Sequence, residues 1–115
     1  AEKAAAAALK RRLIAEKAAG FAPDTDKTAV FENGLDIKEL QLLADALCKK
    51  AGGIRGAFSG ADGAFSFAIC GEETALGDFF AEFKAAFNTR GGGRNGIRQG
   101  TVCADRAEIE RLFTE

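Results

Sequence analysis

The chain has 115 residues and a mass of 12.0 kDa, which is enough for one domain with a buried core and too little for two. Its net charge of −1 and pI of 5.6 exclude a free-standing module that binds nucleic acid by charge alone, because such binding grows with the number of phosphates neutralised. Ten phenylalanines must supply most of the bulky core volume, because Trp, Tyr and Met are absent. Since a complete translated chain normally begins with Met, we interpret the sequence as a piece of a longer protein.

The N-terminal segment predicts a connector helix followed by a linker. Residues 2–19 contain five consecutive alanines and neither Gly nor Pro, which favours a helix. Its apolar stripe is thin, with Leu9, Leu13 and Ile14, so we expect this helix to lean on a partner rather than to enter a core. Pro and Asp in the next few residues are poor continuers of regular structure. The predicted organisation is a connector helix and linker over residues 1–26 and a globular domain over residues 27–115.

The periodicity of apolar residues after this boundary predicts alternating strands and helices. Asp36, with Glu39 three residues later, is expected to begin a helix as a capping box. The fold class is therefore α+β, a mixed sheet packed with helices, in the order α-β-α-β-β-α-β-α. The predicted elements are a strand over 27–32, a helix from about 36 to 51, a hairpin of strands 54–59 and 65–70 joined by 60–63, a helix over about 74–88, a strand over 97–103 and a last helix after residue 105.

Three phenylalanines on the predicted hairpin, Phe58, Phe65 and Phe67, invite comparison with a sheet that stacks RNA bases. The order β-α-β-β-α-β is also that of the RNA-recognition motif. The register does not fit, however, because the motif requires a basic residue, Gly, an aromatic, a small residue and an aromatic, whereas residues 62–66 read Asp-Gly-Ala-Phe-Ser. We therefore predict that these rings belong to the core.

Side chains suited to catalysis or metal binding are scarce. The chain contains no His, which removes the commonest general base and metal ligand. Cys48, Cys70 and Cys103 are widely spaced and form no Cys-x-x-Cys motif, which favours reduced thiols with a packing role. Neither a membrane-spanning run nor a signal segment is visible in the sequence. We predict a non-enzymatic, cytoplasmic chain without cofactor or metal.

The segment of residues 89–100 is the strongest functional candidate, because it combines five glycines and three arginines with no acid. Such a segment can bring backbone N–H groups and guanidinium groups to a phosphate. It follows a predicted helix rather than a strand, so it is neither a Walker loop nor a dinucleotide fingerprint. At that place it would face the negative end of the helix dipole. The alternative is that Arg90 caps the helix while the glycines permit a tight turn.

Residues from about 27 to 113 resemble the C-terminal domain shared by alanyl-tRNA synthetases, free-standing alanyl-tRNA editing proteins and DHH phosphoesterases. Residues 33–47, the hairpin, and Gly91-Gly-Gly-Arg94 leading to Gln99-Gly100 carry the resemblance. The preceding alanine-rich helix is similar to the connector that joins this domain to the editing domain, and residues 99–113 look closer to the editing-protein branch. In this sequence Arg90 stands where the family commonly has Lys, and Asn95 stands where it has Pro.

The resemblance implies a non-catalytic, tRNA-associating domain of an alanyl-tRNA editing or synthetase-like protein, with tRNA-Ala as partner. It also implies the residues that would contact the nucleic acid, which are Arg90, Gly91, Gly92, Gly93, Arg94, Arg98 and Gln99. Two other hypotheses stay open. The chain could be the substrate-phosphate-binding half of a DHH-type phosphoesterase, or a structural module that forms a homodimer through its N-terminal helix.

Overall fold

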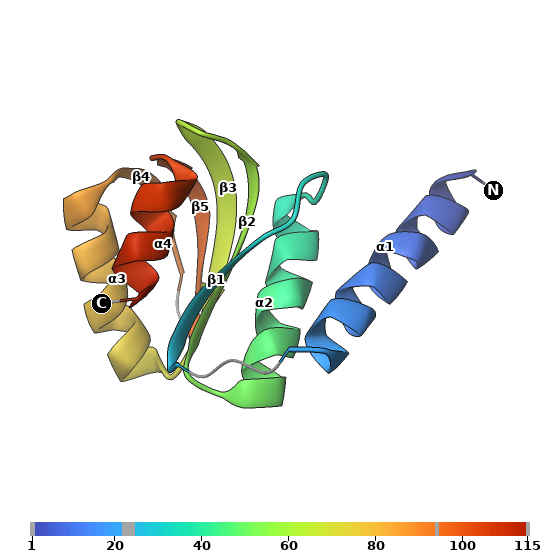
Figure 1. The fold of residues 1–115 in the computed structure, drawn as a ribbon, viewed down its shortest axis with the longest axis horizontal. Coiled ribbons are helices and arrows are strands. Elements are labelled where there is room, and N and C mark those ends of the chain that lie inside the picture. Colours follow the sequence, from blue (N-terminus) through green and yellow to red (C-terminus); the bar gives the residue numbers. More distant parts are fainter. Residues whose placement is uncertain (1, 22–24, 94, 115) are drawn as a thin grey trace.

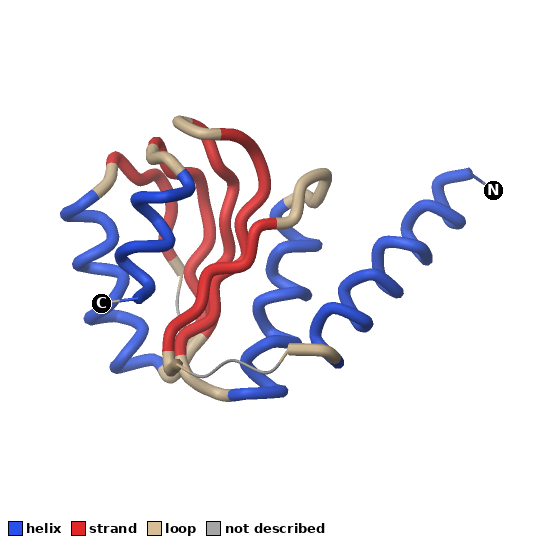
Figure 2. Tube along the Cα trace, viewed as in Figure 1, coloured by secondary structure: helices blue, strands red, loops and turns tan. Residues whose placement is uncertain are grey.

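The computed structural model describes residues 2–21, 25–93 and 95–114, and the side chains of all of these except residues 2–8 and 10. One five-stranded mixed sheet, in the order β1-β2-β3-β5-β4, lies between two layers of helices (Figures 1 and 2). Helices α1 and α2 lie on one face of the sheet, and α3 and α4 lie on the other. The elements are α1 (Glu2–Ala19), β1 (Lys27–Phe31), α2 (Ile37–Ala51), β2 (Ile54–Ala61), β3 (Ala64–Cys70), α3 (Glu73–Ala86), β4 (Asn88–Gly92), β5 (Ile97–Cys103) and α4 (Arg106–Thr114).

The predicted α+β class and the order of its elements are confirmed, with one additional strand, β4. Strand β1 runs parallel to β2, while the pairs β2–β3, β3–β5 and β5–β4 are antiparallel. None of the helices, over the described part of the chain, has the length and apolar content that a membrane crossing requires.

Helix α2 begins where the sequence predicts. The Asp36 carboxylate accepts a hydrogen bond from the Glu39 backbone N–H, and the Glu39 carboxylate accepts one from the Asp36 N–H. This capping box satisfies two of the amides that a helix start leaves without partners. The buried face of the helix carries Leu40, Leu43, Ala44 and Leu47, and it packs on the small side chains Ala57 and Ala68 of the sheet.

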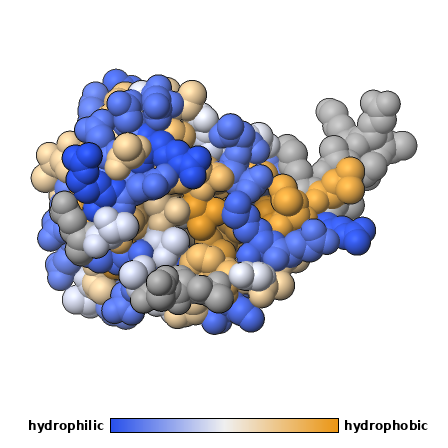
Figure 3. All heavy atoms as spheres, viewed as in Figure 1, coloured by the Kyte–Doolittle hydropathy of each residue, from blue (hydrophilic) through white to orange (hydrophobic). Residues whose placement is uncertain are grey.

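Helix α1 packs against α2 and also contacts the end of β1. Ile14 and Ala18 are buried in the same cluster as the core residues of α2, and Lys17 forms an ion pair with Glu32 at 2.6 Å. Leu9 and Leu13, in contrast, are 67% and 42% exposed, and apolar atoms lie on the surface of this helix (Figure 3). The helix therefore packs against α2, as expected, and part of its apolar stripe remains exposed to solvent. The division into residues 1–26 and 27–115 stays a prediction.

The opposite face of the sheet holds the phenylalanine core. Phe58, Phe65 and Phe67 are buried in one cluster with residues of α3 and α4. The Phe58 ring lies within 6.4 Å, between ring centroids, of five other rings. The interpretation of these rings as core, and not as a base-stacking platform, is confirmed.

The segment after α3 corrects one prediction. Residues 88–92, which we expected to end a helix and open a loop, form the edge strand β4, antiparallel to β5. Only residues 93–96 connect the two strands. Asn95 and Gly96 both have positive φ, 59° and 84°, as a tight hairpin turn requires. The Asn-Gly dipeptide was the available sequence signal for this hairpin, and the surrounding glycines and arginines suggested a loop instead.

Candidate nucleic-acid interface

The predicted site residues on β5 lie on opposite faces of the sheet. Arg98 is paired in register with Ile69, which belongs to the core beneath α3. Gln99 is paired with Ala68, which lies beneath α2. Because successive side chains of a strand point to opposite faces, the structure separates these two predicted contacts.

Arg98 holds the β4–β5 hairpin to the start of α3. Its guanidinium group donates to both oxygens of the Glu73 carboxylate, at 3.0 and 2.5 Å, and the Arg98 side chain is only 11% exposed. The same carboxylate accepts the backbone N–H of Gly96 at 2.8 Å. Glu73 thus occupies the donors that we had considered for a phosphate.

The hairpin tip also lies at the other end of α3 from the one expected. We predicted that the segment would face the C-terminal, negative end of the helix dipole, but Gly96 contacts Glu73 in the first turn. That helix start already has anionic partners, since the Glu72 carboxylate accepts from the N–H groups of Thr74 and Ala75. The carboxylates of Glu72 and Glu73 therefore complement the positive end of this dipole themselves.

The Glu73 contacts predict an acid-sensitive hairpin. The Arg98 hydrogen bonds, followed by that from Gly96, lower the pKa of Glu73 to about 2 from an ordinary value of 4.5. Because the folded-state pKa is the lower one, the stabilisation is complete above about pH 4.5 and is lost as the pH falls towards 2.

We expect Glu73→Gln to lower the thermal unfolding midpoint at pH 7 and to flatten its decline between pH 4.5 and pH 2. Circular dichroism melts across this range measure both effects. Glu82→Gln, an exposed change on the same helix, is the control and should keep the wild-type profile. Identical profiles for the wild type and Glu73→Gln would contradict the assignment.

Of the two predicted arginines that the structure describes, Arg90 is the accessible one. It lies on the edge strand β4 opposite Thr101, its side chain is exposed, and the described residues provide it with neither an ion pair nor a hydrogen bond. It does not cap α3, whose last turn ends with the Phe87 N–H donating to Phe83. Arg94 lies outside the described residues.

The glycines of the hairpin differ in what they do. Gly91 and Gly93 have φ of 143° and 159°. A Cβ at Gly91 would lie 2.1 Å from the backbone oxygen of Gln99, and one at Gly93 would lie 2.3 Å from that of Ile97. Their small size is therefore needed by the backbone itself. A Cβ at Gly92, in contrast, would meet nothing within 4 Å. Gly92 is thus the glycine of residues 91–93 at which a side chain would have room.

Beside α2, the uncovered half of the sheet forms a groove of about 550 Å³. Its wall is one flank of the helix, and its floor is formed by the ends of β3 and β5. Asn95 of the hairpin turn closes one end. We call it the α2–β5 groove, and its other lining residues are Lys38, Gln41, Leu42, Asp45, Cys70 and Ile97.

Gln99 contains the one buried side-chain oxygen or nitrogen that lacks a hydrogen-bond partner within the described part of the chain. This atom is the amide Oε1. Gln99 lies on the same face of β5 as Ile97, which lines the α2–β5 groove, and is paired with Gly92 of the edge strand. Gln99 is not itself one of the residues that line the groove, and its Oε1 is buried beside the groove floor without the hydrogen bond that buried polar groups normally have.

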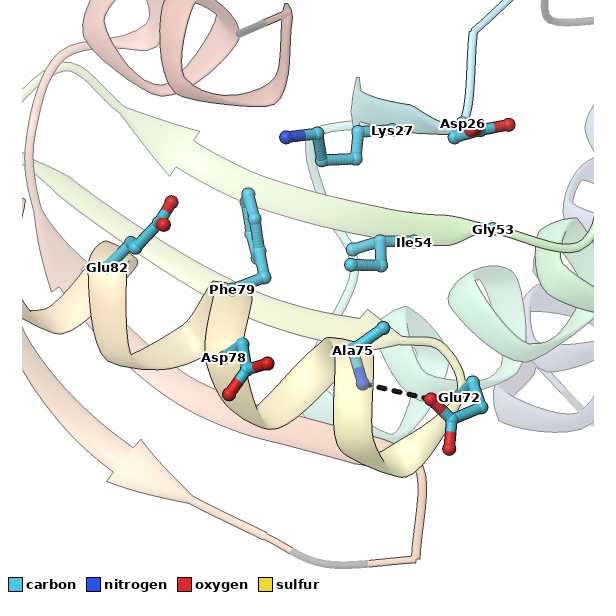
Figure 4. Close-up of a pocket in the computed structure, with 9 residues that line it drawn as sticks. All are labelled: Asp26, Lys27, Gly53, Ile54, Glu72, Ala75, Asp78, Phe79 and Glu82. Carbon is cyan, nitrogen blue, oxygen red and sulfur yellow. Dashed lines mark hydrogen bonds between the residues drawn. The ribbon is translucent and has the colours of Figure 1, made fainter.

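A second pocket, of about 490 Å³, lies on the other face of the sheet (Figure 4). The Phe79 ring stands in it between α3 and β1, with the Lys27 ammonium 5.6 Å from its centroid. Its charge is unsuited to a polyanion, because its lining includes four carboxylate side chains and one ammonium group. These are Asp26, Glu72, Asp78 and Glu82 against Lys27.

The sequence did not indicate the partners that determine which of the predicted residues are free to bind a ligand. No local sequence signal indicates the contact of Glu73 with Arg98, 25 positions away. Lys38 and Gln41 were not considered either. Their only signal was their place on the polar side of an otherwise apolar helix pattern.

No protein-family model matches this sequence, and no curated protein is significantly similar to it. The structure is similar to the C-Ala domain of alanyl-tRNA synthetase from Aquifex aeolicus, with a TM-score of 0.56. The similarity covers 76% of this chain and 90% of that domain, at 17% sequence identity. At this level of identity, the comparison shows that the two share a fold.

Proposed function

We propose that this chain is a non-catalytic tRNA-binding domain of an alanyl-tRNA synthetase-like or alanyl-tRNA editing protein. The observation that carries the proposal is the fold shared with a C-Ala domain of alanyl-tRNA synthetase. The motif order of the sequence supports the same family. The cytoplasmic setting, the preference for tRNA-Ala and the editing branch belong to this proposal.

The contact surface that we propose is the open side of the β4–β5 hairpin. Arg90 offers a guanidinium group without an internal partner among the described residues, and Gly92 lets a ligand approach the backbone closely. Gly91 and Gly93 then act by shaping the strand. Arg94 remains a proposed phosphate contact because it follows Gly93 directly in the sequence. Arg98 would contact phosphate only by giving up Glu73, so we assign it to holding the hairpin.

Arg90→Ala is expected to weaken binding of tRNA-Ala about fivefold and to reduce the slope of log K against log salt by about 1, because one phosphate contact is lost. Fluorescence anisotropy titrations at several salt concentrations measure both quantities. Arg111→Ala removes another exposed guanidinium group, from α4 on the opposite face of the sheet, and should change neither. Equal losses in the two variants would indicate non-specific charge attraction, and no binding by the wild type would remove the proposal.

A homodimer through α1 is a further part of the proposal. Leu9 and Leu13 lie four residues apart on α1 and are 67% and 42% exposed. We expect sedimentation to show a dimer that Leu9→Lys with Leu13→Lys converts to a monomer. This variant keeps Ile14 and Ala18, which dock α1 on α2. A wild type that sediments as a monomer at all tested concentrations would contradict the dimer.

A further inference from the structure

The α2–β5 groove has the composition of a site for a flat, partly polar ligand. Its apolar part comes from the exposed Leu42 and the half-buried Ile97, which can contact the face of a ring. Gln41 and Asn95 add carboxamides at its rim, and each carries both donors and an acceptor. A volume of about 550 Å³ is within the range of small-molecule sites. Nucleobases offer this combination of an apolar face and a hydrogen-bonding edge.

The unpartnered Gln99 oxygen supplies the second observation. Gln99 and Ile97 lie on the same face of β5, two residues apart, and Ile97 forms part of the groove floor. None of the described residues donates to this buried acceptor, which is costly, so a rotation of the Gln99 side chain towards a ligand N–H group in the groove would be favoured. Base edges carry such groups.

The charges near the groove suit a nucleotide chain. Lys38 lines the groove from α2, while Arg90 lies on the strand next to β5, opposite Thr101. The groove has one carboxylate, Asp45, which forms an ion pair with Lys49 at 3.0 Å. A backbone that follows β4 past Arg90 would therefore reach the groove without meeting an unpaired carboxylate among the groove's lining residues.

We propose that the α2–β5 groove holds one unstacked nucleobase of the bound RNA, with the Gln99 amide oxygen accepting a hydrogen bond from its edge. This inference rests on the proposed function, since the phosphates on either side of the base are held by the hairpin. Phosphate contacts position the strand, and the groove adds recognition of a base.

Cys70 provides a probe within the groove. Its thiol lines the cavity, and the neighbouring Cys48 thiol, by a hydrogen bond, lowers the pKa of Cys70 to about 7. The pKa of Cys48 is raised by the same contact and by burial. Cys70 should thus react with iodoacetamide faster than Cys48. Cys103 is exposed at the far end of β5, on the face that carries Arg90, and reports on RNA bound along the hairpin.

The experiment measures alkylation at each cysteine by mass spectrometry, with and without a saturating single-stranded RNA of mixed sequence. A matched oligomer with the same phosphates and no bases is the control. We expect the RNA to slow alkylation of Cys70 about fivefold or more, whereas the base-free oligomer leaves the alkylation rate of Cys70 unchanged. Gln99→Met, which keeps the size of the side chain and removes the acceptor, should weaken the protection about tenfold in RNA concentration.

The outcomes separate the two proposals. If tRNA binds through Arg90 and Cys70 stays as reactive as in the free protein, the groove is empty in the complex and this inference fails while the proposed function stands. Equal protection by the base-free oligomer likewise overturns base recognition. If nucleoside monophosphates protect Cys70 and tRNA does not bind, the groove binds nucleotides and the tRNA proposal fails. If none of these ligands binds or protects, both fail.

Discussion

Replacing Phe58 with alanine is expected to cost about 3–5 kcal/mol in the free energy of unfolding. The side chain is fully buried at the centre of the phenylalanine cluster, where its ring contacts those of β1, β3, α3 and α4. Removing the ring leaves a cavity bounded by elements that cannot close on it, because each is fixed by its own packing. For a domain with a total stability of about 5–15 kcal/mol, this is a large fraction.

Urea unfolding followed by far-ultraviolet circular dichroism measures this loss. Phe31→Ala is the matched control, because Phe31 stacks on Phe58 from the edge strand β1 and is only partly buried. Its cost should be clearly smaller. A Phe58→Ala variant that keeps its stability and selectively loses RNA binding would contradict the assignment to the core and restore the base-stacking interpretation.

Alanine at Gly100 and alanine at Gly92 should have opposite consequences. Gly100 has φ of 153°, and its Cβ would lie 2.0 Å from the Arg90 carbonyl oxygen and 2.7 Å from the Gly91 Cα. Both obstacles are backbone atoms of the paired strand, so a side chain cannot be accommodated by a rotamer change. We expect Gly100→Ala to cost about 3 kcal/mol or more, through backbone strain and disrupted β4–β5 pairing.

Gly92→Ala is expected to leave stability unchanged or to raise it by about 0.4–1 kcal/mol, because its Cβ meets open space and the unfolded chain loses freedom. The same variant should weaken tRNA binding about tenfold if RNA approaches the backbone there. Parallel unfolding and anisotropy measurements test the pair. Unchanged tRNA affinity in Gly92→Ala would assign all the glycines of the hairpin to its backbone geometry alone.

Much of the fold could be predicted because its signals are local or periodic. The capping box of α2 requires only Asp36 and Glu39, and the predicted burial of Phe58, Phe65 and Phe67 follows from strand alternation together with the absence of an RNA-binding motif. Strand β4 was missed because three consecutive glycines carry no side-chain pattern, although the Asn95-Gly96 turn signal was present.

The candidate site could be predicted less well, because its chemistry depends on pairing between distant segments. The sequence by itself determined a phenylalanine core, and it showed a glycine- and arginine-rich segment as the most distinctive feature of the chain. The tertiary structure alone decided that Arg98 is held by Glu73 while Arg90 stays exposed. The reason is physical: which face of the sheet a residue occupies, and which residue meets it there, is set by the register of strands brought together only on folding.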